Sequence, residues 1–199
     1  MGFLSGLFKR REQTREELIK QTTDMMLEGD AKPDKFFEWF GSEPLAKGQT
    51  LDSALAEWHA LTVSGTHYAL VASLGTAEKV SPIINMYRSA FAQRLSPDCR
   101  NIFLQIVMFR EEEYVKAIFK ALKSEDSAQV LKLFGSMARR ITGYYDEEVE
   151  KAGLATVEGP DIGKVTAFSY FVMGQIVPTK EFIDRLQVQI PRLFTGPMG

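Results

Sequence analysis

Charged residues are absent from one long stretch of the chain, which runs from Ala60 to Ala77. In the preceding turns, residues 51 to 59, apolar and charged positions still alternate. This pattern predicts a helix of about 26 residues that enters the core partway along its length and is the most buried helix of the fold. A second uncharged run, residues 165 to 179, is the best candidate to pack against it.

Apolar residues at three- and four-residue spacing predict further amphipathic helices on both sides of this run. They cover residues 14–28, 97–123 and 127–153, and a final helix contains residues 182–190. Ser81-Pro82 and Ser96-Pro97 each pair an N-cap residue with a proline suited to the first helical position, so each predicts a helix start. The two starts bracket a helix of about a dozen residues.

The predicted elements are all helical, and no convincing run of strands is present. The central helix and the two helices that follow Ser96 would each be about 39 Å long at 1.5 Å per residue, so they could lie side by side in antiparallel register. The sequence therefore predicts an all-α, single-domain bundle of about seven or eight helices. Residues 1–11 form a separate amphipathic segment, residues 12–195 the bundle, and residues 196–199 a tail.

Composition agrees with one globular domain. The chain has 199 residues, of which 45% are hydrophobic and 25% charged, and its net charge is −2. This length suffices for one substantial core, and the small net charge gives no general attraction to nucleic acid. A single cysteine excludes an intramolecular disulfide and favours a reducing compartment, so we expect a cytoplasmic protein.

The uncharged stretch 60–77 reaches the length of a membrane-spanning helix, yet its composition argues against that role. It contains several hydroxyl side chains and glycines, together with His67. Such a helix suits a protein interior better than lipid, because small residues let neighbouring helices approach closely. The sequence therefore predicts no transmembrane span.

The first eleven residues combine an apolar face with a basic cluster. Wound as a helix, the four large apolar side chains fall within an arc of about 140° and three cations follow them. The residues are Phe3, Leu4, Leu7, Phe8, Lys9, Arg10 and Arg11. This segment is typical of a reversible anchor on an anionic membrane surface, and the alternative is that the same face docks on the bundle or on a sister subunit.

The two histidines, His59 and His67, are eight positions apart on one predicted helix. Metal ligands on a helix need a spacing of three or four residues to share a face, so we expect no metal site and a hydrogen-bonded structural role for His67. A small-molecule pocket near His67 and Tyr68 is the alternative.

Other candidate chemistry is weaker. Residues 159–166 superficially resemble a phosphate-binding loop but lack its glycine spacing. Cys99 lies near a helix start beside Asp98 and has no histidine nearby in sequence, which favours packing over nucleophilic catalysis. The charged run 110–113 is interpreted as a solvated face. Residues 139–145 pair arginines with tyrosines, but the acidic residues that follow would repel nucleic acid.

These observations predict neither a catalytic residue nor a cofactor. The favoured hypothesis is a non-catalytic adaptor or assembly protein with an unknown protein partner, held reversibly on the cytoplasmic face of a membrane by residues 1–11. A sensor or enzyme with a pocket near His67 is one alternative. A self-assembling structural subunit, and hence a homo-oligomer, is the other.

Overall fold

The computed structural model describes residues 45–148 without a gap, together with residues 16, 17, 19, 20, 23, 24, 27, 181 and 184. Between residues 45 and 148 the chain forms four helices and no strand, which confirms the all-α prediction for this part. The helices are α3 (Leu51–Leu74), α4 (Ala77–Ala92), α5 (Pro97–Lys123) and α6 (Ser127–Thr142). No helix in these ranges is long and apolar enough to cross a membrane.

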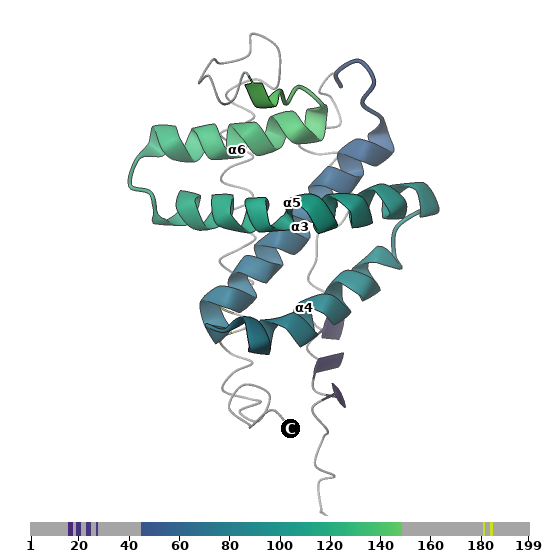
Figure 1. Ribbon diagram of the computed structural model, residues 1–199, viewed down its shortest axis with the longest axis vertical. Helices are drawn as coiled ribbons and strands as arrows, with labels where there is room; N and C mark the ends of the chain where they lie inside the picture. The colour runs from purple at the N-terminus through teal and green to yellow at the C-terminus, as the bar shows by residue number, and fades with distance from the viewer. Residues whose placement is uncertain are drawn as a thin grey trace, which may run out of the picture.

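Helix α3 is the centre of the described fold, because it packs against α4, α5 and α6 (Figure 1). It starts at a capping residue, Thr50, whose side chain accepts a hydrogen bond from the Ser53 backbone N–H. Of the four helices that the structure describes, α3 is the most buried, as predicted. Burial begins earlier than expected, however, since Ala54 is fully buried and Glu57 is 5% exposed. A carboxylate at that depth requires partners, which α5 provides.

The helix start predicted at Ser81-Pro82 is wrong. Helix α4 begins at Ala77, and Pro82 lies inside it, where it removes one backbone hydrogen bond. The chain reaches this helix two residues after Gly75, which ends α3 in a left-handed conformation. Val80 and Ile83 on either side of the proline are almost fully buried. The packing of these two side chains keeps the helix continuous at the proline, because tertiary contacts supply most of the stability of an amphipathic helix.

The second start, at Ser96-Pro97, is confirmed, and so is the end of α5 at Lys123. The prediction of three helices of about 26 residues in antiparallel register is wrong, because α6 has 16 residues and ends at Thr142 rather than near residue 153. Helices α5 and α6 run side by side in opposite directions, whereas α3 crosses α5 obliquely (Figure 1).

The early end of α6 is explained by contacts with the segment that precedes α3. The Ala46 N–H donates to the Thr142 carbonyl at 2.9 Å, and the Gln49 amide donates to the Ile141 carbonyl at 2.8 Å. These bonds satisfy carbonyls that the last turn of a helix leaves unpaired. Gly143 follows with φ +84°, the left-handed conformation common just after a helix. The segment that leads into α3 is thus joined to the end of α6.

We expect Gly143→Ala to lower the free energy of unfolding by roughly 1–3 kcal/mol. An added Cβ would adopt an unfavourable positive φ and would lie 2.7 Å from the Gln49 Cβ. The matched control is Gly75→Ala. Gly75 also has a positive φ, +77°, but no atom lies within 4 Å of the Cβ that alanine would add there. Urea denaturation should show the larger loss for Gly143→Ala. Equal losses would mean that the contact with Gln49 is unimportant.

Candidate functional site

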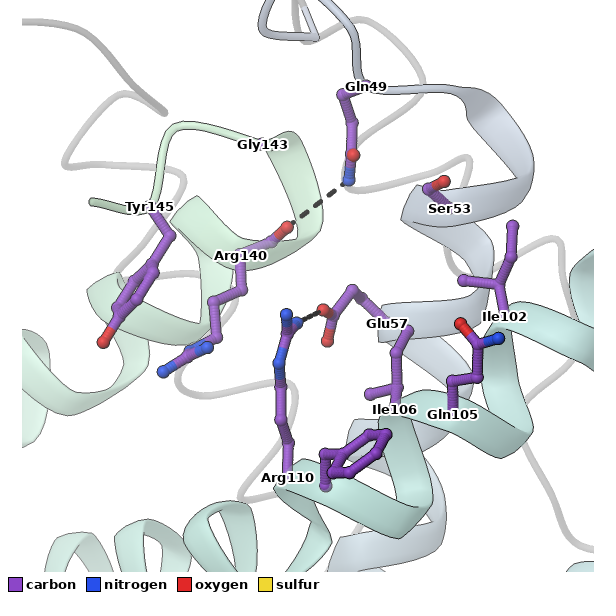
Figure 2. Close-up of a pocket in the computed structure, with 11 residues that line it drawn as sticks. Gln49, Ser53, Glu57, Ile102, Gln105, Ile106, Arg110, Arg140, Gly143 and Tyr145 are labelled. Carbon is purple, nitrogen blue, oxygen red and sulfur yellow. Dashed lines mark hydrogen bonds and ion pairs between the residues drawn. The ribbon is translucent and has the colours of Figure 1, made fainter. Parts of the chain in front are cut away.

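A groove opens between the first turns of α3, the middle of α5 and the end of α6 (Figure 2). Its volume is about 550 Å³. Side chains from all three helices and from the flanking loops line it: Gln49, Ser53, Glu57, Ile102, Gln105, Ile106, Phe109, Arg110, Arg140, Gly143 and Tyr145. The junction of Gln49 with the end of α6 therefore forms one end of the groove.

Glu57 lies at the base of the groove and is held by two residues of α5. Arg110 pairs with its Oε1, and the Tyr114 hydroxyl donates to its Oε2. Figure 2 shows the Arg110 side chain reaching from α5 toward this carboxylate. Burial, followed by the negative charge of Glu57, raises the pKa of Tyr114 well above its usual value. The phenol consequently stays protonated and remains a hydrogen-bond donor to Glu57.

Arg140 forms the side of the groove that belongs to α6. Its Nη2 lies 2.6 Å from the Glu113 Oε1, and its guanidinium stands 3.6 Å from the centre of the Tyr145 ring. The arginine side chain is only 10% exposed. This cation is largely neutralised and covered, so it shapes the groove more than it offers a free charge.

The opposite wall of the groove is apolar and comes from α5. Ile106 is 8% exposed, whereas Phe109 at the rim is 76% exposed. Arg110 beside it has a side-chain exposure of 40%, and Glu57 is its one hydrogen-bonding partner among the described residues. The remaining N–H groups of the guanidinium are free to bind another acceptor.

The interpretation of residues 110–113 as a solvated charged face is wrong for two of them. Glu111 is 4% exposed and binds both His67, at 2.8 Å, and Arg88, at 2.6 Å. Arg110 binds Glu57 in the groove. Glu112 fits the interpretation, because its side chain is 82% exposed and pairs with Lys116.

His67 joins three helices rather than packing in apolar surroundings. Its Nδ1 contacts the Glu111 carboxylate of α5, which in turn holds Arg88 of α4. The hydrogen bond agrees with the predicted structural role. His67 and Tyr68 line neither the main groove nor a smaller cavity of about 270 Å³ between α5 and α6. The alternative of a ligand pocket at these two residues stays a prediction.

The other histidine, His59, is buried edge-on to Phe91, and its Nδ1 has no hydrogen-bond partner in the part of the chain that the structure describes. Burial lowers its pKa from 6.5 to about 4. As the pH falls, His59 is therefore protonated in the unfolded chain before it is protonated in the folded one. The free energy of unfolding is highest above about pH 6.5 and decreases as the pH falls toward 4.

Between about pH 7 and pH 5 this histidine alone should remove about 2 kcal/mol of stability. The substitution His59→Phe keeps the aromatic packing on Phe91. Over the same pH range, the free energy of unfolding of this variant should decrease by about 2 kcal/mol less than that of the wild type. Urea denaturation of both proteins at the two pH values measures the difference. Parallel losses would show that His59 is not buried in its neutral form.

Cys99 is buried near the start of α5. Burial, with a smaller effect from Asp52, raises the pKa of its thiol to about 11. A protonated, enclosed thiol is a poor nucleophile, which agrees with the predicted packing role. Among the described residues no cluster of three candidate metal ligands occurs.

Several predicted features lie outside the described residues. They include the uncharged run 165–179, nearly all of the final helix at residues 182–190, and the tail at residues 196–199. The loop at residues 159–166 and the basic amphipathic segment also belong to them; the residues of that segment are Phe3, Leu4, Leu7, Phe8, Lys9, Arg10 and Arg11. All of these interpretations stay predictions.

Sequence reasoning did not find the groove, because its central pair is separated by 53 residues. One local signal existed. Glu57 stands between Ala54 and Leu61 on the face that carries the apolar residues of α3, and a charge on such a face needs a partner. Nothing in the sequence indicates which arginine provides it.

Comparison with models of protein families, with curated proteins and with solved structures found no match to this chain.

Proposed function

We propose that this protein is a non-catalytic binding module whose groove between α3, α5 and α6 receives a short segment of a partner protein. The observation that carries the proposal is the rim of the groove, where Phe109 is 76% exposed beside a half-exposed Arg110. Aromatic residues and arginine are enriched in protein interfaces and among the residues that dominate binding energy.

The polarity of the lining favours a peptide over an apolar small molecule. Small-molecule pockets of this size are predominantly hydrophobic, whereas this groove also carries amide and hydroxyl groups from Gln49, Ser53 and Gln105. A peptide backbone supplies both donors and acceptors for such groups. The same segment would place one large apolar side chain against Phe109.

Charge favours an acidic segment. Arg110 and Arg140 are the two cations among the lining residues, and Glu57 is the one anion. Arg140 is already neutralised by Glu113. Arg110 is therefore the residue that would bind a partner carboxylate, using the N–H groups that Glu57 leaves free.

The state of Glu57 supports a binding role over catalysis. Its two oxygens are engaged separately by Arg110 and Tyr114. A general base must reach the proton that it removes, and this carboxylate is held in place by the two groups that occupy it. We therefore assign Glu57 the role of positioning Arg110.

Attachment to a membrane surface through residues 1–11 remains part of this proposal. It rests on the amphipathic pattern of that segment and on its three consecutive cations.

A phage-displayed library of random peptides provides the test, with binding of recovered peptides measured by fluorescence anisotropy. We expect enriched peptides to combine an acidic residue with a large apolar one. Phe109→Ser should weaken their binding at least about tenfold, because burying a phenylalanine contributes roughly 1.5–3 kcal/mol. Met108→Ser is the matched control, since Met108 is 70% exposed but does not line the groove. Failure to enrich any peptide, or equal effects of the two substitutions, would contradict the proposal.

A further inference from the structure

We infer that α5 also pairs with α5 of a second copy of this chain, antiparallel and about a two-fold axis. The starting observation is a stripe of exposed apolar side chains on α5. Leu104 is 45% exposed, Met108 70% and Phe119 46%, and Val115 between them is half-buried. At 3.6 residues per turn these four residues fall within an arc of about 60°. We call them the α5 stripe.

The spacing of the stripe is symmetric about its own centre. Leu104 and Phe119 are equidistant from a point between residues 111 and 112, and so are Met108 and Val115. In an antiparallel pair centred on that point, Leu104 of each copy would face Phe119 of the other, and Met108 would face Val115. A two-fold interface uses the same patch on both subunits, and this arrangement meets that requirement.

Charges beside the stripe select the antiparallel orientation. Asp98 lies in the first turn of α5 and Lys123 in its last turn, and both flank the stripe on the same side. An antiparallel pair brings the acid of each copy near the lysine of the other, whereas a parallel pair would place Asp98 and Lys123 at opposite ends of the interface. Near the centre, Glu112 of each copy lies beside the axis, where Lys116 of its own helix neutralises it. Antiparallel helix dipoles add to the preference.

This surface is separate from the groove. Phe109 lies about 110° farther around α5 than the centre of the α5 stripe, and no residue of the stripe lines the groove. A 27-residue helix is about 40 Å long and about 10 Å across, so one face offers on the order of 400 Å². Stable interfaces bury roughly 800 Å² on each partner. The stripe alone is therefore suited to a weak, reversible dimer.

Sedimentation velocity over a range of protein concentrations tests the association. We expect a reversible monomer–dimer equilibrium whose dissociation constant rises at least about tenfold in Met108→Lys, because two lysines would be brought into the apolar seam. Phe109→Ser is the control and should leave the equilibrium unchanged. A protein that stays monomeric at all concentrations, or a dimer that Met108→Lys does not weaken, would overturn the inference.

Single cysteines test the register, using a short bismaleimide as the cross-linker. Glu112→Cys lies beside the axis and should link to itself. Leu104→Cys and Phe119→Cys should not link to themselves, because two copies of either residue would be about 22 Å apart along the axis. An equimolar mixture of these two variants should give the cross-linked pair. The native Cys99 is buried and should stay unmodified. Self-linking of Leu104→Cys, or no link in the mixture, would contradict the antiparallel register.

Discussion

Replacing Glu111 with alanine is expected to lower the free energy of unfolding by about 3–5 kcal/mol, the usual effect of removing one partner from a buried ion pair. Glu111 is 4% exposed and holds His67 of α3 and Arg88 of α4 at the same time. Without Glu111, His67 and Arg88 would lose their common acceptor, and the buried Arg88 Nε already has no hydrogen-bond partner among the described residues. The ionic contact that connects α3, α4 and α5 would be lost.

The neighbouring residue provides the control for this measurement. Glu112 is 82% exposed, and its one ion-pair partner among the described residues is Lys116, one turn away, so Glu112→Ala should leave the denaturation midpoint almost unchanged. Chemical denaturation of the two variants under identical conditions compares a buried and an exposed carboxylate one residue apart. Similar midpoints for Glu111→Ala and Glu112→Ala would show that the contacts of Glu111 with His67 and Arg88 do not stabilise the fold.

The second large effect is expected at Glu57, where alanine should lower the free energy of unfolding by about 2–4 kcal/mol. The loss would leave the Tyr114 hydroxyl, whose residue is 2% exposed, without its acceptor. It should be smaller than at Glu111, because Arg110 is 40% exposed and can bind water instead.

A double-mutant cycle with Tyr114→Phe checks this explanation. Removing the hydroxyl should be destabilising when Glu57 is present and nearly neutral when Glu57 is already alanine, so the coupling energy should be about 1–3 kcal/mol. Strictly additive effects would mean that the two side chains do not stabilise each other through the hydrogen bond.

The helices that sequence reasoning placed correctly are those with strong local signals. Helix α5 begins at Ser96-Pro97 because a capping hydroxyl and a proline act within one turn. Helix α4 was misplaced because the same dipeptide pattern, Ser81-Pro82, occurs inside a helix that buried residues hold together. The end of α6 was missed because it depends on Gln49, which is 92 residues away from the carbonyl that it binds.

The groove could not be predicted for the same reason. Its components lie on α3, α5 and α6, and each has an ordinary interpretation in its own segment. Arg110 begins a charged run, and Glu57 belongs to an alternating pattern. Only the oblique crossing of α3 and α5 brings these two residues together (Figures 1 and 2). Tertiary contacts therefore determine the site, whereas local patterns determine most of the helix boundaries.

The most direct test of the central claim is an NMR titration of the isotope-labelled protein with an acidic, apolar peptide recovered from the display library. The account predicts that the largest shifts of backbone amide signals occur at residues 49–53, 102–110 and 140–145, and that Phe109→Ser abolishes them. Shifts concentrated on α4, or shifts that persist unchanged in Phe109→Ser, would contradict the assignment of the groove as the binding site.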